Sequence, residues 1–551
     1  MSGSAIEICE RANPPIPAAP GLPSFRLLSM PWRKAIPAML LLLAACGGGG
    51  GGGGSSSGGG TGGGGPGVGQ VTLSSVAISP LNPTQIEGTT SSLALTGTYS
   101  DGSTRDLSGG ASWTSNTASV ATVTGGVVSA LAAGSATITA TYGGMSASTV
   151  VTVKAATLTY LHAFGPPPDA SQPNGPLLLA SDGNFYGTSR AGGANRCGDI
   201  DFPCGAVFKV TPDGKETVIS SFGLSATDAY RPNAGLIQGK DGALYGTTSN
   251  GGTYGGGTVF KVTLGGVRTI LYSFGATLTD GVVPTAALIQ ADDDNFYGTT
   301  SSGGGNHCGN IPQAGGNCGT IFRVTPQGVE TVMHSFGAFA GDGVEPLGAL
   351  LQASDGNFYG TTIDGGAGTC GVSVDIPNSC GTVFKMTPAG VVTIIHSFGA
   401  KGDGIAPQGT LVQGADGALY GTTPSGGAVG YASGIVFRIT LAGKETVFYS
   451  FGPALTDGDG PSPFLILASD GNFYGTTRSG GANQCTSCGT VFRLTPAGAH
   501  TVLASFGPVN IAPNDPGAGV TEGPDGALYG VTFSGPAGVS LGGNVFKLVI
   551  R

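Results

Sequence analysis

"SDGNFYGTTRSGGANQCTSCGTVFRLTPAG" at residues 469–498 contains the pattern that decides the fold, because related copies of it recur along the chain. Each copy has an Asp-Gly or Asp-Asp turn before F/L-Y-G, followed later by a short segment of the form G-x-V/I-F-K/R. The copies begin 52 to 62 residues apart, at Asp182, Asp241, Asp293, Asp355, Asp416, Asp470 and Asp525. A period of this length with several short β runs in each copy predicts the blades of a β-propeller.

One repeat contains four expected strands, which in the first copy are "GPLLLA", "NFYGTS", "AVFKV" and "ETVISSF". The turns "SDGN" and "TPDG" between them carry the Asp-Gly and Pro-x-Gly signals of tight turns. The last copy ends after its third strand at Arg551, while "LTYLHAFG" at 158–165 matches the fourth strands of the other copies. We therefore expect residues 156–551 to form a seven-bladed propeller in which both ends of the repeat array share one blade.

The composition agrees with an all-β chain. Of 551 residues, 104 are glycine, 35 are proline and only 10% are charged, which suits many short strands and tight turns and excludes a long helical protein. The formal net charge of −9 would repel nucleic acid, so we expect no nucleic-acid partner.

Residues 71–154 alternate apolar and polar residues in runs such as "SLALTGTYS" and "SATITATY", separated by short turns. This pattern predicts a small β-sandwich. The stretch resembles the bacterial immunoglobulin-like domain, group 2, and Trp113 stands at that family's buried tryptophan position. The resemblance implies a spacer, with ligand binding as the alternative.

The N-terminal segment 30–46, "MPWRKAIPAMLLLLAAC", has a basic start, an apolar stretch and a small-residue cleavage site ending in cysteine. It resembles the lipobox of bacterial lipoproteins, which implies cleavage after residue 45 and acylation of Cys46; an ordinary secretory signal is the alternative. Residues 1–29 read as an upstream extension, with Met30 as a second candidate initiator. Residues 46–70 then form a lipidated, Gly/Ser-rich linker, and we expect an exported protein anchored to the outer membrane or cell surface through its lipid.

The repeats at 156–551 resemble the GloVer tandem-repeat family, on the seven copies quoted above. The resemblance implies an exported bacterial protein with propeller-like repeats, and it implies no established biochemical activity.

Eight cysteines lie in the repeats, as four pairs that each fall between the second and third strands of one copy: Cys197 and Cys204, Cys308 and Cys318, Cys370 and Cys380, Cys485 and Cys488. In an exported protein this distribution predicts four local disulfides. Metal binding is the alternative for all pairs, and redox activity is a second alternative for the C-x-x-C pair.

A basic residue follows the phenylalanine of every third strand: Lys209, Lys261, Arg323, Lys385, Arg438, Arg493 and Lys547. We expect its stem to pack on the tyrosine of "YG" and its charge to reach the aspartate of the turn. A ring of cations around an anionic ligand is the alternative.

A second repeated acid forms the motif D-x-x-x-P, at Asp169, Asp228, Asp280, Asp342, Asp403 and Asp457. Such an aspartate usually bonds its own backbone. Cation coordination is the alternative, and a calcium ion near Asp457 and Asp459 is its best candidate; we predict no other metal or cofactor.

The sequence favours a non-enzymatic surface module that binds or adheres to a glycan or protein, and we expect a monomer. His162, His334 and His396 stand where other copies have Tyr, Ser or Ala, so they predict no catalytic constellation. A propeller lyase or hydrolase and a purely structural envelope component remain as alternatives. The loops that vary between copies emerge on one face, where we expect a ligand to meet these residues: Arg190, Asp228, Arg231, Asp364 and Arg478.

Overall fold

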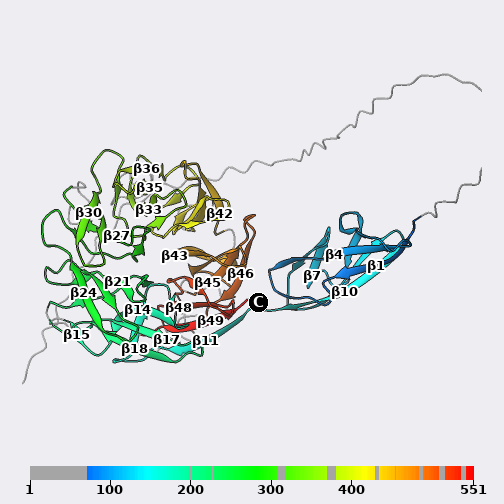
Figure 1. Ribbon diagram of the computed structural model, residues 1–551, viewed down its shortest axis with the longest axis horizontal. Helices are drawn as coiled ribbons and strands as arrows, with labels where there is room; N and C mark the ends of the chain where they lie inside the picture. Colours follow the sequence, from blue (N-terminus) through cyan, green and yellow to red (C-terminus); the bar gives the residue numbers. More distant parts are fainter. Residues whose placement is uncertain are drawn as a thin grey trace, which may run out of the picture. The chain divides into compact units, whose positions relative to one another are not determined.

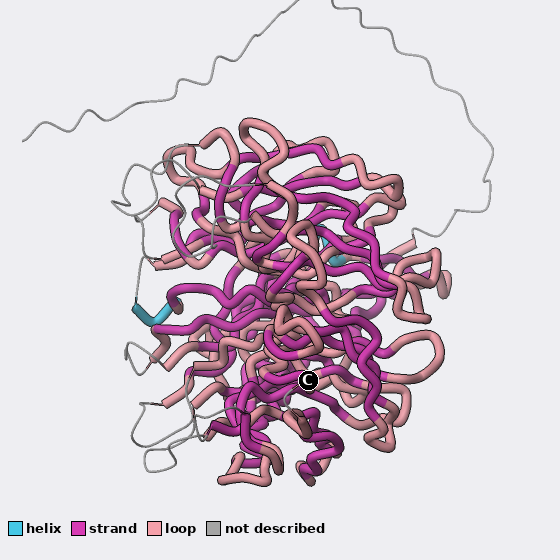
Figure 2. Tube along the Cα trace, turned by 90° about the vertical axis from the view of Figure 1, so that its left-hand side faces the viewer, coloured by secondary structure: helices cyan, strands magenta, loops and turns pink. Residues whose placement is uncertain are grey.

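The computed structural model describes residues 71–197, 202–225, 227–306, 318–368, 380–428, 433–452, 455–482, 488–507, 515–534 and 542–550. In these ranges the chain is strand and loop apart from two short 3-10 turns, η1 (Ser108–Gly110) and η2 (Leu455–Asp457) (Figure 2). None of the helical segments found there is long and apolar enough to cross a membrane. The expected all-β class is confirmed, whereas the expected signal, Cys46 and the linker lie outside the described residues.

The first described part, from Leu73 to Lys154, is a small β-structure of three sheets. One sheet contains β1 (Leu73–Ser79), β4 (Ala94–Tyr99) and β5 (Thr104–Asp106); the second contains β2 (Thr84–Ile86), β10 (Met145–Lys154), β9 (Gly134–Tyr142) and β6 (Ser112–Ser115); the third contains β3 (Thr90–Ser92), β8 (Val127–Ala130) and β7 (Ala121–Thr124). In β9 every second residue, Ala136, Ile138 and Ala140, enters a common core, as period-two alternation requires. Trp113 is only partly buried against this core, and its indole N–H donates to the carbonyl of Ser108 at 3.0 Å.

From Thr157 onward the chain forms antiparallel sheets in which strands consecutive in a repeat are neighbours, as the expected four-strand repeat requires. A representative sheet runs β32 (Leu351–Gln352), β33 (Phe358–Thr362), β35 (Thr382–Met386) and β36 (Val392–Ser397). The first strand of this sheet, β32, has only two residues and is shorter than the apolar run that predicted it. A proline, Pro346, and the small residues Gly348 and Ala349 precede it.

The other sheets repeat this order. Their strands are β12 (Ala170–Pro173), β13 (Leu178–Leu179), β14 (Phe185–Gly192), β17 (Ala206–Val210) and β18 (Glu216–Ser221); β20 (Ile237–Gln238), β21 (Leu244–Thr248), β23 (Thr258–Val262) and β24 (Arg268–Ser273); β26 (Ile289–Gln290), β27 (Phe296–Thr300), β29 (Thr320–Val324) and β30 (Glu330–Ser335); β38 (Val412–Gln413), β39 (Leu419–Thr423), β41 (Ile435–Ile439) and β42 (Glu445–Ser450); β43 (Asp459–Leu467), β44 (Phe473–Ser479), β45 (Thr490–Leu494) and β46 (His500–Ser505); and β47 (Val520–Glu522), β48 (Leu528–Thr532), β49 (Asn544–Val549) and β11 (Thr157–Ala163).

Short two-stranded ribbons extend several sheets at the end where the second strand finishes. They are β15 (Arg196–Cys197) with β16 (Phe202–Pro203), β19 (Ala229–Tyr230) with β22 (Asn250–Gly251), β25 (Gly281–Val282) with β28 (Ser302–Gly303), β31 (Gly343–Val344) with β34 (Asp364–Gly365), and β37 (Gly404–Ile405) with β40 (Ser425–Gly426).

The sheets follow one another around a common centre (Figure 1). The expected pairing of the two ends of the repeat array is present, because β11 is antiparallel to β49, with Thr157 opposite Val549. Tyr529 of the last sheet also stacks on Phe185 of the first, with ring centroids 4.2 Å apart. The propeller-like ring is thus closed by hydrogen bonds and by ring packing.

Aromatic residues fill the space between adjacent sheets. The phenylalanine of the third strand is fully buried in every sheet, and the phenylalanine that follows the fourth strand packs edge-on against it from the neighbouring sheet, as Phe222 does on Phe260 at 5.1 Å. The glycine of "YG" leaves room for this ring, since a Cβ on Gly187 would lie 2.4 Å from Phe208. The glycine of F-Y-G is therefore required by the close packing of the second strand against the phenylalanine of the third.

Candidate functional site

A cavity is lined by the segments that enter the first strands of the repeat sheets. It has about 790 Å³ of empty space, part of it open to solvent. Each sheet contributes residues just after its repeated proline: Asn174, Asn233, Thr285, Leu347, Gln408, Pro463 and Gly517. Because these residues come from sheets along the whole ring, the cavity depends on ring closure.

A turn with an unusual backbone conformation precedes each of these lining segments. The residue before the repeated proline has a positive φ, 57° at Arg231, 60° at Val283 and 58° at Glu345, and the same holds at Gln172, Ala406 and Asp515. Such a conformation costs a non-glycine residue roughly 1–3 kcal/mol, so the surroundings must hold it. At Glu345 the backbone N–H donates to the carbonyl of Cys318 at 2.9 Å, and the carbonyl accepts from Ile363 at 3.2 Å.

Arg478 is the charged side chain that lines this cavity. It lies at the end of β44, is exposed, and stands among amide, hydroxyl and apolar lining groups that include Phe464. Burial raises the pKa of nearby Asp515, an effect that the charge of Arg478 partly offsets. The Oδ1 atom of Asp515 is buried with no hydrogen-bond partner in the described structure.

The other four residues that we expected to contact a ligand do not line the cavity. Arg190 occupies the position of Arg478 at the end of β14 and is exposed, but it does not line the cavity. Arg231 is half-buried at a strained turn, and Asp364 is buried beside Glu345. Burial and the charge of Asp364 raise the pKa of Glu345. Of the five residues, Arg478 is thus the one placed to contact a ligand in the cavity.

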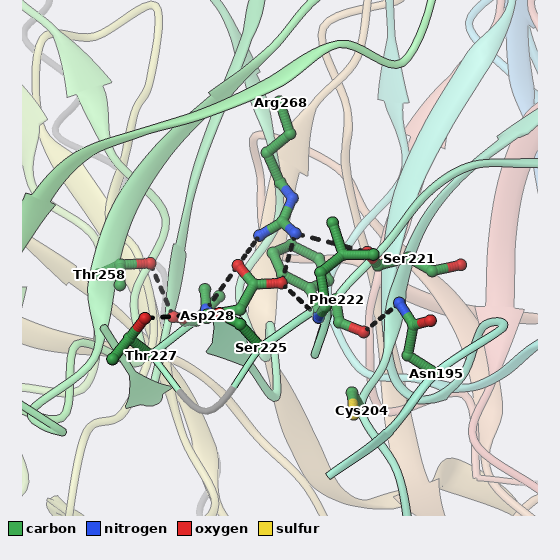
Figure 3. Close-up of polar contacts among 12 residues, drawn as sticks. Asn195, Cys204, Ser221, Phe222, Ser225, Thr227, Asp228, Thr258 and Arg268 are labelled. Carbon is green, nitrogen blue, oxygen red and sulfur yellow. Dashed lines mark hydrogen bonds and ion pairs between the residues drawn. The ribbon is translucent and has the colours of Figure 1, made fainter. Parts of the chain in front are cut away.

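Asp228 is occupied by a structural contact (Figure 3). The guanidinium of Arg268 donates to both of its carboxylate oxygens at 2.8 and 2.7 Å, and the N–H groups of Leu224 and Ala229 donate to them at 2.8 Å. Both side chains are at least nine-tenths buried, and Arg268 lies 4.3 Å above the ring of Phe222. Although burial raises the pKa of Asp228, the hydrogen bonds and charge of Arg268 hold it below its ordinary value. This carboxylate joins two sheets and is not open to a ligand.

Asp228 belongs to a set of contacts that we call joints. A joint contains a residue near the end of one fourth strand, the aspartate of D-x-x-x-P, and the first residue of the next fourth strand. Members on the described residues are His162, Asp169 and Glu216; Asp228 and Arg268; Tyr272, Asp280 and Glu330; His334 and Asp342; His396, Asp403 and Glu445; and Tyr449, Asp457 and His500. Burial, together with the joint aspartate, raises the pKa of Glu216, Glu330 and Glu445 to about 7.

The proposed calcium ligand Asp457 takes part in such a joint. Its carboxylate accepts from the hydroxyl of Tyr449 at 2.7 and 2.8 Å and lies 2.9 Å from Nδ1 of His500. Asp459 has a buried Oδ1 without a partner in the described residues, and burial raises its pKa. Where the structure is described, the clusters of three metal-ligating side chains do not include either residue. Calcium at this position stays a prediction without support from the geometry.

The expected contact between the repeated basic residue, the tyrosine and the turn aspartate is described for Lys261, Lys385, Arg438 and Lys547, whereas Arg323 and Arg493 donate to Thr331 and Thr501. In one sheet the hydroxyl of Tyr359 donates to Asp355 at 2.8 Å, and Nζ of Lys385 lies 3.0 Å from the same carboxylate and 5.6 Å from the tyrosine ring. Lys261, Arg438 and Lys547 form the corresponding ion pairs at 2.6 to 2.7 Å. These cations are held in the sheets, which favours the structural interpretation.

One predicted disulfide is described in full, between Cys197 and Cys204, with Cα atoms 5.2 Å apart. Cys318, Cys380 and Cys488 are also disulfide-bonded. Their predicted partners, Cys308, Cys370 and Cys485, lie outside the described residues.

Sequence reasoning missed the cavity lining and the joint glutamates. A signal for the first was present, because the residue after the repeated proline changes from copy to copy while the proline itself is constant. The second had no comparable signal, since Glu216, Glu330 and Glu445 share their position with Arg268, Val392 and His500.

Comparison with known proteins gives one family and several distant similarities. The family model described as the Gloeobacter/Verrucomicrobia repeat matches residues 88–312 and 372–551. Ice-binding protein 1 of Shewanella frigidimarina (strain NCIMB 400) is 38% identical over 117 residues, which are 21% of this chain and 12% of that protein. The chain thus spans about an eighth of this relative.

Solved structures are similar at low identity. They include the extracellular domain of a protein described as a hybrid two-component system of Bacteroides thetaiotaomicron (11% identity, TM-score 0.41, covering 75% of this chain and 43% of that one) and the GH74 xyloglucanase of Xanthomonas campestris (15% identity, TM-score 0.37, covering 69% and 53%). A quinoprotein alcohol dehydrogenase-like protein of B. thetaiotaomicron is 10% identical with a TM-score of 0.35, covering 77% of this chain and 93% of its own. We draw no activity from these similarities.

Proposed function

This chain belongs to the Gloeobacter/Verrucomicrobia repeat family, and on that premise we propose that it is a non-enzymatic surface protein whose propeller binds an acidic glycan in its cavity. The proposal includes a propeller of seven blades, which the closed succession of repeat sheets supports. It also includes an immunoglobulin-like spacer at 71–154, which the alternating strands around one core support.

The observation that carries the proposal is the chemistry of the cavity lining. Asn174, Asn233 and Gln408 offer amides that both donate and accept hydrogen bonds, as sugar hydroxyls require. Phe464 adds an apolar surface, and the guanidinium of Arg478 suits a carboxylate or sulfate group. A concave site with a few convergent polar groups is the usual form of a small-ligand site.

The framework around the cavity favours binding without rearrangement. The lining segments are fixed by hydrogen bonds at their strained turns, and the loop between β14 and β17 is cross-linked by the Cys197–Cys204 disulfide. A site that is ordered before the ligand arrives loses less conformational entropy on binding. This order supports recognition of a ligand inside the cavity.

The location that we propose rests on the sequence alone. The lipobox-like segment at 43–46 and the Gly/Ser-rich linker support a protein held on the outer membrane or cell surface through a lipid on Cys46. The linker would give the folded part freedom to reach ligands away from the lipid surface.

Ice binding is not proposed for this chain. The match to the ice-binding relative covers 117 residues, only 12% of that protein.

A glycan array probed with the full chain tests the proposal. We expect binding to glycans with carboxylate or sulfate groups. Arg478→Gln should weaken binding roughly 10- to 100-fold, because a charge-assisted hydrogen bond contributes about 1.5–3 kcal/mol. Arg190→Gln is the matched control, since Arg190 occupies the equivalent position in another sheet and does not line the cavity.

Equal losses in both variants would place the ligand elsewhere on the face, and binding that neither variant changes would contradict the cavity assignment. Mass spectrometry of the bound glycan checks the enzyme alternative, because a shortened or unsaturated product would show a hydrolase or lyase.

A further inference from the structure

Two joints bring together three side chains of the kinds that bind metal ions. In the first, atoms of His162, Asp169 and Glu216 all lie within 4.8 Å of one another. In the second, the same holds for His396, Asp403 and Glu445. Each set comes from two neighbouring sheets and the segment between them, so it exists only in the folded ring.

In the first joint, one polar atom of each side chain has no hydrogen-bond partner in the described structure. His162 Nε2, Asp169 Oδ1 and Glu216 Oε1 are each buried without a hydrogen-bond partner, and Glu445 Oε1 of the second joint is as well. Buried polar atoms in folded proteins are nearly always paired with protein, water or an ion. An unpaired atom on each of three neighbouring side chains therefore indicates a missing partner, which a bound cation would supply.

The nitrogen–oxygen distances within the two joints are compatible with a shared metal ion. Nε2 of His162 lies 3.6 Å from Oδ2 of Asp169, which accepts from the N–H of Gly165, and His396 Nε2 lies 3.3 Å from Oδ2 of Asp403, within hydrogen-bond range. A tetrahedral site with bonds of about 2.0–2.2 Å has ligand atoms roughly 3.3–3.6 Å apart. A hydrogen bond between nitrogen and oxygen is typically shorter, at about 2.7–3.2 Å.

The other described joints provide an internal comparison, because none of them has the full set of histidine, aspartate and glutamate. Val392 takes the place of the glutamate beside His334 and Asp342, and there the nitrogen–oxygen distance is an ordinary 3.1 Å. Tyr272 takes the place of the histidine beside Asp280, where its hydroxyl donates to the carboxylate at 3.0 Å. The longer separation thus occurs where all three ligand types are present.

We propose that the joints His162–Asp169–Glu216 and His396–Asp403–Glu445 each bind a divalent transition-metal cation, with zinc as the best match. One imidazole and two carboxylates form a mixed nitrogen and oxygen set that suits zinc, whereas calcium takes six to eight oxygen ligands. Water would complete the coordination. No electron transfer or bond cleavage is involved.

The first site borders a surface pocket and lies between two neighbouring sheets. Its Asp169 and Glu216 line a pocket with Pro166, Ala194 and Val218, and the side chains of His162 and Asp169 are 23% and 22% exposed. His162 belongs to β11, the strand that closes the ring, while Glu216 begins β18 of the next sheet. A cation here would tie the closing strand to its neighbour.

Zinc titration of the full chain after treatment with a chelator tests the proposal, with the disulfides kept oxidised and manganese and calcium run in parallel. We expect two equivalents of zinc per chain and a higher Tm with zinc. His162→Tyr and His396→Tyr should each remove one equivalent, and the double variant should remove both. Tyrosine is chosen because the chain itself has it at this joint position in Tyr272 and Tyr449, so the variants should fold.

Two further variants sharpen the result. His334→Tyr is the matched control and should leave two equivalents, because its joint lacks the glutamate. Val392→Glu supplies that glutamate and should raise the number to three. A chain that takes up no zinc, or an unchanged number in the His162→Tyr and His396→Tyr double variant, would overturn the proposal.

Discussion

Glu330→Gln should make the chain more stable at pH 8 and leave its stability nearly unchanged at pH 5. Glu330 lies at the joint with Tyr272 and Asp280, and Asp280 is only 5% exposed. Burial and the charge of Asp280 raise the pKa of Glu330 from 4.5 to about 7. The folded chain therefore favours the neutral form of this side chain, which glutamine imitates.

The sign and size follow from proton linkage. Since the pKa is higher in the folded chain than in the unfolded one, the contribution of Glu330 is fully present below pH 4.5 and is lost as the pH rises to about 7. A difference of this size corresponds to roughly 3.4 kcal/mol in a fully buried group. Glu330 is partly exposed, and solvent screening reduces the effect to about 1–2 kcal/mol.

Urea unfolding at pH 5 and pH 8 measures the effect as the change in the free energy of unfolding between variant and parent. Thr331→Ser, at an exposed neighbour on the same strand, is the control and should show no dependence on pH. If Glu330→Gln changes stability by the same amount at both pH values, the assignment of a neutral glutamate at this joint is refuted.

Three other variants test separate parts of the structure. Tyr359→Phe removes the hydroxyl that donates to Asp355 and should cost about 0.5–1.5 kcal/mol in urea unfolding, with glycan binding unchanged. Asp228→Ala leaves Arg268 buried without its partner and should cost about 3–5 kcal/mol in the same measurement; a cost below about 1 kcal/mol would mean that the pair is solvated. Cys46→Ser should move the protein from the membrane fraction to the soluble fraction, and a variant that still sediments with membranes would refute lipid anchoring.

Much of the fold could be predicted because its signals are local. The "SDGN" turns, the F-Y-G motif and the period of the copies each reflect contacts within one repeat, and the match of 158–165 to the fourth strands predicted the pairing of β11 with β49. The contact of Lys385 with Tyr359 and Asp355 followed from simple strand pairing.

The site was harder because it depends on how neighbouring sheets are placed. Asp228 looked available from its motif, yet Arg268, forty positions later, occupies both of its oxygens. The joint partners Asp169 and Glu216 are likewise distant in sequence, and their approach depends on the angle between two sheets. Among the expected ligand residues, only Arg478 lines the cavity. The turns that place the other lining residues could not be recognised from the sequence, because the residue before the proline differs from copy to copy.

The central claim is that both ends of the repeat array share one sheet, because the cavity and the proposed ligand site depend on this closure. A Thr157→Cys, Val549→Cys double variant tests it directly, since these residues are opposite one another in β11 and β49. Facing positions of antiparallel strands have Cα separations that a disulfide can span. We predict that mild oxidation links the two cysteines within one chain and gives a faster-migrating monomer on non-reducing electrophoresis, whereas the Thr157→Cys single variant does not. Disulfide-linked dimers, or a double variant whose two cysteines stay free, would contradict the account.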